Sequence, residues 1–263
     1  MTASEDFTFE GVNVGVRSIT LLLHLYGIHL LWRDKWKKHF LLINVALTNV
    51  AMCCCSFAKL ALTLLRNEIA LRYLLGIVAT GFLVTYFGSL FLLTVQRFLE
   101  VRLHMSYSNS FFEMHKQRIC ALIWISSLLY AVIMTVALHH GVSEHVIYDT
   151  IPHVYEMVWQ FVLVLQFFIV YGYLYGKFRQ SGKTPSLKRR TIFVPFIVVF
   201  SFIIFDTVPG ILLYFLSTEY NIKNVITLLY SLDMLCNSLL YIFIRKDVRG
   251  QIARRAIESP VHV

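Results

Sequence analysis

The stretch that decides the fold is Leu228-Leu-Tyr-Ser-Leu-Asp233-Met-Leu-Cys-Asn237-Ser-Leu-Leu-Tyr241-Ile-Phe-Ile-Arg245. It is long enough to cross the ~30 Å hydrocarbon core of a bilayer as a helix. Asp233, Asn237 and Tyr241 follow one another at spacings of four, which places them on one helical face. An acid and an amide are unfavourable in lipid, so this face is expected to turn toward other helices and water. The stretch therefore predicts a membrane bundle with a polar interior.

The composition extends this interpretation to the whole chain. Hydrophobic residues make up 57% of the 263 positions, charged residues make up 15%, and the mean hydropathy is +0.66. That is more apolar surface than the core of a soluble domain requires. We expect an all-α membrane protein, a seven-transmembrane helix bundle forming a single domain over residues 1–263. The spans are predicted at about 12–32, 40–65, 73–101, 119–139, 156–178, 191–216 and 224–244.

The distribution of charge predicts the orientation of the chain. Most of the 24 lysines and arginines gather in short segments near 33–38, 97–118, 177–190 and 245–255. The positive-inside rule makes these segments cytoplasmic. We therefore expect an extracellular tail at 1–11 and a short amphipathic cytoplasmic helix with a tail at 245–263. The same distribution explains the net charge of +9 by contact with membrane lipids and without a nucleic-acid partner.

Charged residues inside the first two spans need a route out of the lipid. Arg17 is expected to snorkel toward the outer headgroups. Lys59 lies in the outer half of the second span, where it either snorkels or provides a counter-charge in a ligand pocket. The five cysteines all lie within or beside apolar runs, so no extracellular disulfide is expected.

Several polar positions resemble motifs of the rhodopsin-like (class A) G-protein-coupled receptors. Asn237-Ser-Leu-Leu-Tyr241 looks like the Asn-Pro-x-x-Tyr motif of the seventh helix, with Ser238 in place of the proline. Asn44-Val-Ala-Leu-Thr-Asn49 resembles Asn-Leu-Ala-x-Ala-Asp in the second helix, with Asn49 in place of the acid.

The third and sixth spans carry two further resemblances. Gln96-Arg97-Phe98 resembles the Asp-Arg-Tyr motif, with both neighbours of the arginine changed. Phe200-Ser-Phe-Ile-Ile-Phe205-Asp206-Thr207-Val208-Pro209 resembles Phe-x-x-Cys-Trp-x-Pro, with Thr207 in place of the tryptophan. Each motif is short, but they occur one to a helix and in the order of the family.

The resemblance implies a divergent orphan receptor of the plasma membrane. An extracellular small molecule or peptide would bias an equilibrium between inactive and active bundles, and the sixth helix would swing about Pro209 to admit a heterotrimeric G protein. Such a receptor is not an enzyme and needs no cofactor or metal.

The resemblance also assigns residues to the inner switch. Arg97 would contact the G protein, and Tyr171 would pack toward it in the active state. Gln96 cannot form the family's ion pair, and the inner end of helix six, Lys188-Arg189-Arg190, repels the arginine. We therefore expect Arg97 to be weakly held, with high basal signalling.

The core positions leave two readings open. The family binds sodium with the acid that Asn49 replaces, and Asp233 on the facing helix could take its place. The other reading is a structural hydrogen bond between Asn49 and Asp233 without an ion.

The ligand pocket is expected near Lys59, Ala79, Asp206 and Thr207. Ala79 stands where the family's amine-binding aspartate would be, so a monoamine ligand is disfavoured.

The alternative function is a small ion-coupled or proton-coupled transporter. Lys59, Asp206 and Asp233 would then form a relay of ionisable groups across the membrane. Many transporters are built from two related halves with broken helices, and this sequence has no such internal symmetry. An enzyme is disfavoured because no zinc motif or Ser/His/Asp set occurs.

Overall fold

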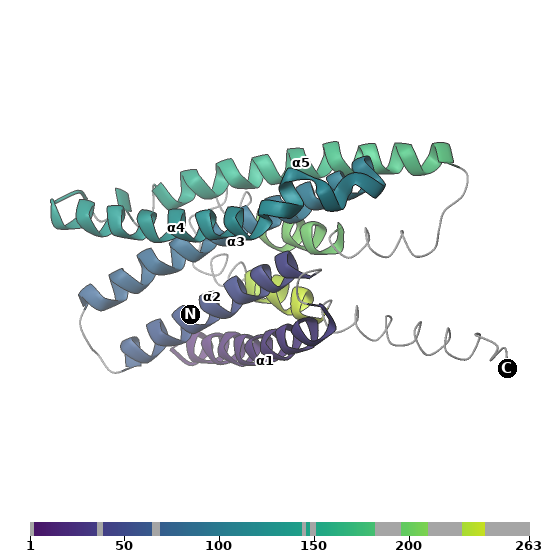
Figure 1. Ribbon diagram of the computed structural model, residues 1–263. Helices are drawn as coiled ribbons and strands as arrows, with labels where there is room; N and C mark the ends of the chain where they lie inside the picture. The colour runs from purple at the N-terminus through teal and green to yellow at the C-terminus, as the bar shows by residue number, and fades with distance from the viewer. Residues whose placement is uncertain are drawn as a thin grey trace.

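The computed structural model describes residues 3–35, 39–64, 69–143, 146–147, 151–181, 196–209 and 228–239, which are almost entirely helical (Figure 1). The five long helices are α1 (Ala3–Lys35), α2 (Phe40–Leu64), α3 (Ile69–Leu103), α4 (Phe111–His139) and α5 (Ile151–Ser181). Each of the five is long and apolar enough to cross a membrane. The chain is therefore a multi-pass membrane protein. Five predicted spans are confirmed as helices, and the last two are described only in the helical segments 196–209 and 228–239.

Helix α3 is the central element of the bundle. It packs against α2, α4 and α5, while α1 packs against α2 on the other side (Figure 1). The 228–239 segment lies beside α1 and α2, with Met234 Sδ 4.0 Å from Cys53 Sγ. The core joins the middle of α3 to α2 and to the 196–209 segment through residues such as Val45, Phe87 and Phe202, each 0% exposed. The 196–209 segment is thus packed directly on α3.

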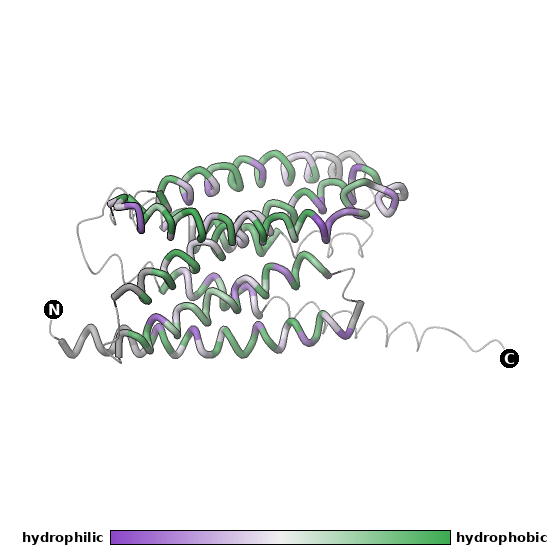
Figure 2. Tube along the Cα trace, turned by 60° about the vertical axis from the view of Figure 1, so that its left-hand side comes forward, coloured by the Kyte–Doolittle hydropathy of each residue, from purple (hydrophilic) through white to green (hydrophobic). Residues whose placement is uncertain are grey.

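The outer helices keep large apolar side chains on the outside of the bundle. Hydrophobic residues run along most of each helix (Figure 2), and α4 exposes the most conspicuous row of them. Its exposed members include Leu122, Ile125, Leu129, Ile133 and Val136. Such a face suits lipid, because hydrocarbon chains solvate apolar side chains as well as a protein core does.

Helix α4 begins at Phe111, earlier than the predicted start at 119. Ser110 caps it, since its hydroxyl accepts a hydrogen bond from the Glu113 backbone N–H at 3.2 Å. The sequence Ser110-Phe-Phe-Glu113 has the spacing of a capping box, a signal that a hydropathy pattern does not register. Residues 111–118, most of which are polar or charged from Glu113 onward, therefore belong to α4 and not to the loop before it.

Two glycines let α3 and α4 approach closely. A Cβ atom at Gly88 would lie 3.0 Å from Ile123, and one at Gly81 would lie 3.1 Å from the backbone oxygen of Ser127. The Ser127 hydroxyl in turn donates to the Gly81 carbonyl. Small residues at helix contacts, with hydroxyls bonded across them, are a common way to join helices where lipid removes the hydrophobic driving force.

Asn44 joins three helices near the centre of the bundle. Its Nδ2 donates to Ser89 Oγ at 2.6 Å, and its Oδ1 accepts from Trp124 Nε1 at 2.9 Å. Asn44 is 6% exposed, so water does not compete for these bonds. The amide therefore fixes α2, α3 and α4 relative to one another.

We predict that Asn44→Ala lowers the unfolding free energy by about 0.6 kcal/mol for each bond lost and by about 1.7 kcal/mol at most, the average and maximum for hydrogen bonds between membrane helices. Thermal unfolding of the purified full chain measures this loss. Trp124→Phe removes the indole N–H that Asn44 satisfies, so the double variant should lose less than the sum of the two single variants. Strictly additive losses would contradict the assignment.

Candidate functional site

A buried carboxylate lies at the centre of the polar interior. Asp233 Oδ2 accepts from Tyr86 Oη at 2.9 Å and from Asn237 Nδ2 at 3.1 Å. Asn237 Nδ2 also lies 3.3 Å from Tyr86 Oη, and its Oδ1 accepts from Ser201 Oγ at 3.3 Å. Asp233 is 4% exposed and Asn237 is 0% exposed, so the polar face faces inward as expected. These bonds connect α3, the 196–209 segment and the 228–239 segment.

The predicted hydrogen bond between Asn49 and Asp233 is wrong. Both side-chain polar atoms of Asn49 are buried without a hydrogen-bond partner in the described part of the chain, and so is Asp233 Oδ1. The described donors to the carboxylate are Tyr86 of α3 and Asn237, both of which bond to Oδ2. Sodium binding at Asn49 and Asp233 stays a prediction.

Arg97 has a carboxylate partner that the sequence interpretation missed. It is 7% exposed, and its Nη1 pairs with Glu100 Oε2 at 2.5 Å. Gln96 Nε2 donates to the other oxygen of Glu100 at 2.9 Å. The expectation of a weakly held arginine considered the adjacent Gln96 and the basic end of helix six, whereas an acid three positions along a helix lies on the same face. Glu100 thus supplies the charge that Gln96 lacks.

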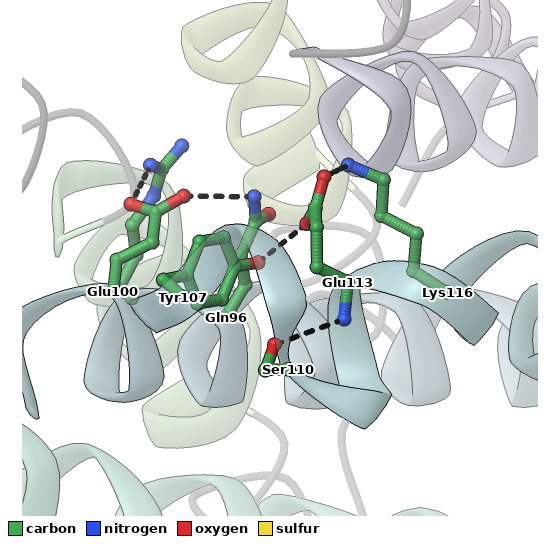
Figure 3. A network of polar contacts seen from close by, with 7 residues as sticks. Gln96, Glu100, Tyr107, Ser110, Glu113 and Lys116 are labelled. Atoms are coloured by element: carbon green, nitrogen blue, oxygen red, sulfur yellow. Dashed lines mark hydrogen bonds and ion pairs between the residues drawn. The ribbon is translucent and has the colours of Figure 1, made fainter. Parts of the chain in front are cut away.

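A second acid stabilises the loop that follows α3. Tyr107 in the 3-10 helix η1 (His104–Asn109) donates to Glu113 Oε2 at 2.7 Å, and Lys116 pairs with the other oxygen of Glu113 (Figure 3). Burial raises the pKa of Tyr107 above its usual value, and its hydrogen bond to Glu113 adds to the rise. The phenol therefore keeps its proton and remains a donor. Glu100, near the end of α3, and Glu113, at the start of α4, lie on either side of Gln96 and Tyr107 (Figure 3).

Tyr171 lies in an aromatic cluster between α5 and the 196–209 segment. Its ring centroid is 4.8 Å from that of Phe167 and 5.0 Å from that of Phe196. Phe98, the neighbour of Arg97, packs against the same cluster. The Tyr171 hydroxyl and Arg97 Nε are both buried without a hydrogen-bond partner in the described residues. Both groups thus retain bonding capacity that a rearrangement could satisfy. The other two predicted switch residues, Arg189 and Tyr241, lie outside the described residues.

The helix that contains Pro209 is irregular where the sequence predicts a kink. Residues Ile203–Thr207 form a π turn, η3, and the Val208 N–H donates to the Ile203 carbonyl. Pro209 is buried directly after this turn. Proline has no N–H and crowds the preceding turn, which favours a local change of hydrogen-bond register. Single π turns inside α-helices are frequent at functional sites.

A cavity of about 260 Å³ opens among the helices above Asp233. It is lined by residues of α1, α2, α3, α5 and the 228–239 segment: Arg17, Met52, Cys53, Ser56, Ala79, Thr80, Leu83, Tyr86, Glu156, Tyr230, Ser231, Asp233 and Met234. Ala79 lines this cavity, and its place in a ligand pocket stays a prediction. The cavity shares Tyr86 and Asp233 with the polar cluster.

The other predicted pocket residues lie elsewhere or are not described. Lys59 is exposed on α2 and is not among the described residues that line the cavity. Thr207 is buried inside the π turn and is likewise not among them. The side chain of Asp206 lies outside what the structure describes. The ion relay of the alternative function requires Lys59 and Asp233 in one cavity, and this cavity does not bring them together.

Arg17 faces the cavity, so the prediction that it snorkels toward the headgroups is wrong. Its Nε donates to Ser231 Oγ at 3.2 Å, and Ser231 Oγ donates to Asn13 Oδ1 at 2.8 Å. The sequence contains the signal: Asn13, Arg17, Thr20 and His24 recur at spacings of four and three, which gives α1 one polar face. Thr20 and His24 on this face are both 0% exposed.

Glu156 brings a charge of opposite sign to the cavity from α5. Its Oε1 accepts from Tyr230 Oη at 3.2 Å and from Gln160 Nε2 at 3.2 Å. Tyr230 and Ser231 are consecutive, so the 228–239 segment contacts Glu156 with one side chain and Arg17 with the next. No sequence pattern singled out Glu156, which is an isolated acid in an apolar span.

Comparison with known proteins identifies no family for this chain. No protein-family model matches the chain, and no curated protein matches it significantly. The five cysteines are free thiols.

We predict that Asp233→Ala destabilises the chain more than Asp233→Asn does. Alanine removes the acceptor of two buried donors, Tyr86 Oη and Asn237 Nδ2, which costs about 1–3 kcal/mol. Asparagine keeps an acceptor oxygen in nearly the same shape. Thermal unfolding of the full chain in lipid nanodiscs measures both, with Tyr86→Phe as the background in which alanine should do less harm. Equal losses for the two variants would contradict the assigned bonds.

Proposed function

We propose that this protein is a divergent rhodopsin-like G-protein-coupled receptor that spans the plasma membrane seven times, with its N-terminus outside. The observation that carries the proposal is the continuity between the cavity and the 196–209 segment. Tyr86 and Asp233 line the cavity, and both bond to Asn237, which accepts from Ser201 of that segment. A ligand in the cavity therefore acts on residues that determine the position of the predicted sixth helix.

The 196–209 segment has the properties of a moving part. It meets α3 through Phe202, whose ring centroid lies 5.8 Å from that of Tyr86 and 5.5 Å from that of Phe87 in edge-to-face contacts. The π turn and Pro209 interrupt the regular helix at the C-terminal end of this segment. Rearrangement of the Tyr86, Asp233 and Asn237 bonds would thus be transmitted to a segment with a local hinge.

The inner end offers a matching switch. Arg97 is held by Glu100 on its own helix, so the resting state does not depend on an acid of the predicted sixth helix. Separation of the α5 and 196–209 cluster from Phe98 would expose the guanidinium together with the unpartnered Tyr171 hydroxyl. A positively charged side chain released at the cytoplasmic end is the contact that a heterotrimeric G protein would use.

We predict that the purified full chain co-precipitates Gα subunits after nucleotide removal and that Arg97→Ala lowers the recovery at least about tenfold, as expected for loss of an interfacial charge-assisted bond. Arg102→Ala is the matched control, because Arg102 is an exposed arginine on the same helix whose guanidinium lies over Phe98 at 5.8 Å. Equal recovery for Arg97→Ala and the wild type would refute the proposal.

We also predict that Glu100→Gln raises coupling in the absence of ligand. Glutamine keeps the shape of the side chain but removes the charge that pairs with Arg97, an effect of about 1–2 kcal/mol for a half-buried pair, or roughly tenfold in the equilibrium. Nucleotide exchange on Gα measured with reconstituted protein reads this out. Reduced exchange with unchanged thermal stability would show that Glu100 does not restrain Arg97.

A further inference from the structure

One row of exposed side chains on α4 contains a single polar residue. The members of this α4 row recur in steps of three and four residues, which places them on one face of the helix. They are Phe111, Met114, Arg118, Leu122, Ile125, Leu129, Ile133 and Val136, and all of them are exposed. We propose that the α4 row binds an anionic phospholipid, with the lipid phosphate on Arg118 and an acyl chain along the apolar residues that follow it. Such a site would serve a receptor and a transporter alike.

The length of α4 places Arg118 at the edge of the hydrocarbon core. The helix has 29 residues. At 1.5 Å per residue it is roughly 44 Å long, whereas the hydrocarbon core is ~30 Å thick. The stretch 119–138 is mostly apolar and is long enough to fill the core, so the first two turns, with Glu113 and Arg118, extend into the headgroup layer. A charged side chain that faces lipid is stable at this depth, because it reaches headgroups and water.

The acid closest to Arg118 in sequence is engaged on the bundle side of the helix. Glu113 pairs with Lys116 and accepts from Tyr107 Oη at 2.7 Å (Figure 3). The side chain of Lys116 is 7% exposed, so this pair lies against the bundle. Arg118, in contrast, is exposed and forms no hydrogen bond or ion pair with another residue that the structure describes. The charge that these turns present to the lipid is therefore positive.

Charge complementarity selects an anionic lipid for this position. The planar fork of a guanidinium binds a phosphate through two N–H···O bonds. A zwitterionic headgroup carries its own cation, which offsets the phosphate charge, whereas an anionic headgroup keeps a net negative charge. The orientation proposed above would place this end of the bundle at the cytoplasmic leaflet, which carries anionic lipids and attracts basic residues.

Apolar side chains on both sides of Arg118 accommodate the rest of the lipid. On the headgroup side, Phe111 is 71% exposed and Met114 is 62% exposed, as is typical of helix faces that lie in the interfacial layer. The Phe111 ring packs on His115, with ring centroids 4.4 Å apart. On the core side, the strip from Leu122 to Leu129 offers an acyl chain an apolar path. A soluble anion would gain the contact with Arg118 but none of these apolar contacts.

A second copy of the chain fits this row less well than a lipid does. Two copies with the same orientation in a membrane are related by an axis along the membrane normal, so identical residues lie at the same depth. Pairing of two α4 rows would bring the Arg118 side chains together, and like charges repel most where water is scarce. A phospholipid brings the opposite charge to the same depth.

The test is native mass spectrometry of the purified full chain with phosphatidylglycerol and phosphatidylcholine of identical acyl chains. We expect the first phosphatidylglycerol to bind about fivefold more tightly than phosphatidylcholine, the factor that one basic residue near an anionic surface supplies. Arg118→Gln should abolish this preference and leave Tm unchanged, because the exposed guanidinium bonds to no described residue. Arg118→Lys keeps the charge and should keep most of the preference.

Arg33→Gln is the matched control. Arg33 is an exposed arginine near the end of α1, at the same end of the bundle as the start of α4 (Figure 1). Its substitution lowers the net charge by the same amount, and the preference for phosphatidylglycerol should remain. A phosphatidylglycerol with a diazirine in its acyl chain should also cross-link to α4 between Leu122 and Leu129, and much less so in Arg118→Gln.

Four results would overturn the proposal. Equal affinity of the wild type for the two lipids would show that the row does not select an anionic headgroup. An equal loss of preference in Arg33→Gln and Arg118→Gln would assign the selection to the net charge of the chain. Cross-links on other helices in place of α4 would move the lipid elsewhere, and a lipid-free dimer joined through α4 would assign the row to a second copy.

Discussion

The structure depends on the requirement that polar groups inside a membrane protein find partners on other helices. Asp233 is the clearest case, because its carboxylate is almost fully buried and holds Tyr86 of α3 and Asn237 of its own segment. Rotation of the 228–239 segment would leave the tyrosine hydroxyl and the amide unsatisfied in a low-dielectric interior. Apolar packing alone would allow many rotations of a smooth helix against its neighbours, so these bonds select one of them.

The same requirement explains how the chain departs from the motifs that it resembles. Gln96 stands where an acid pairs with the arginine in the family, and Glu100, one turn later, provides that acid to both Gln96 and Arg97. Asn49 stands where the family has a core acid, and Asp233 provides a carboxylate from the facing segment. On the receptor that we propose, Glu100 on the same face and Asp233 on the facing segment would supply the acids that these two motif positions lack.

Hydropathy and helical period were sufficient to predict the five described spans and the inward face of Asp233 and Asn237, because both properties depend only on residues close in sequence. The partners of the polar residues were not predictable in the same way. Tyr86 sits in an aromatic run and looks like an ordinary core residue until α3 is placed beside the 228–239 segment. Arg17 was assigned to the headgroups because it was considered alone, whereas Asn13, Thr20 and His24 share its face. Glu156 is a single acid, and its hydrogen bond from Tyr230 joins residues that are distant in sequence.

The strengths of these hydrogen bonds are compatible with the receptor mechanism that we propose. Hydrogen bonds between membrane helices average about 0.6 kcal/mol, and about 1.4 kcal/mol changes an equilibrium tenfold. Exchange of two or three bonds among Tyr86, Asp233, Asn237 and Ser201 is therefore enough to shift the position of the 196–209 segment by a useful factor without unfolding the bundle. The close contacts of α3 with α2 and α4, which rest on Asn44, Gly81 and Gly88, involve none of these four residues. The α2, α3 and α4 contacts thus lie outside the hydrogen-bond network that the proposed ligand would act on.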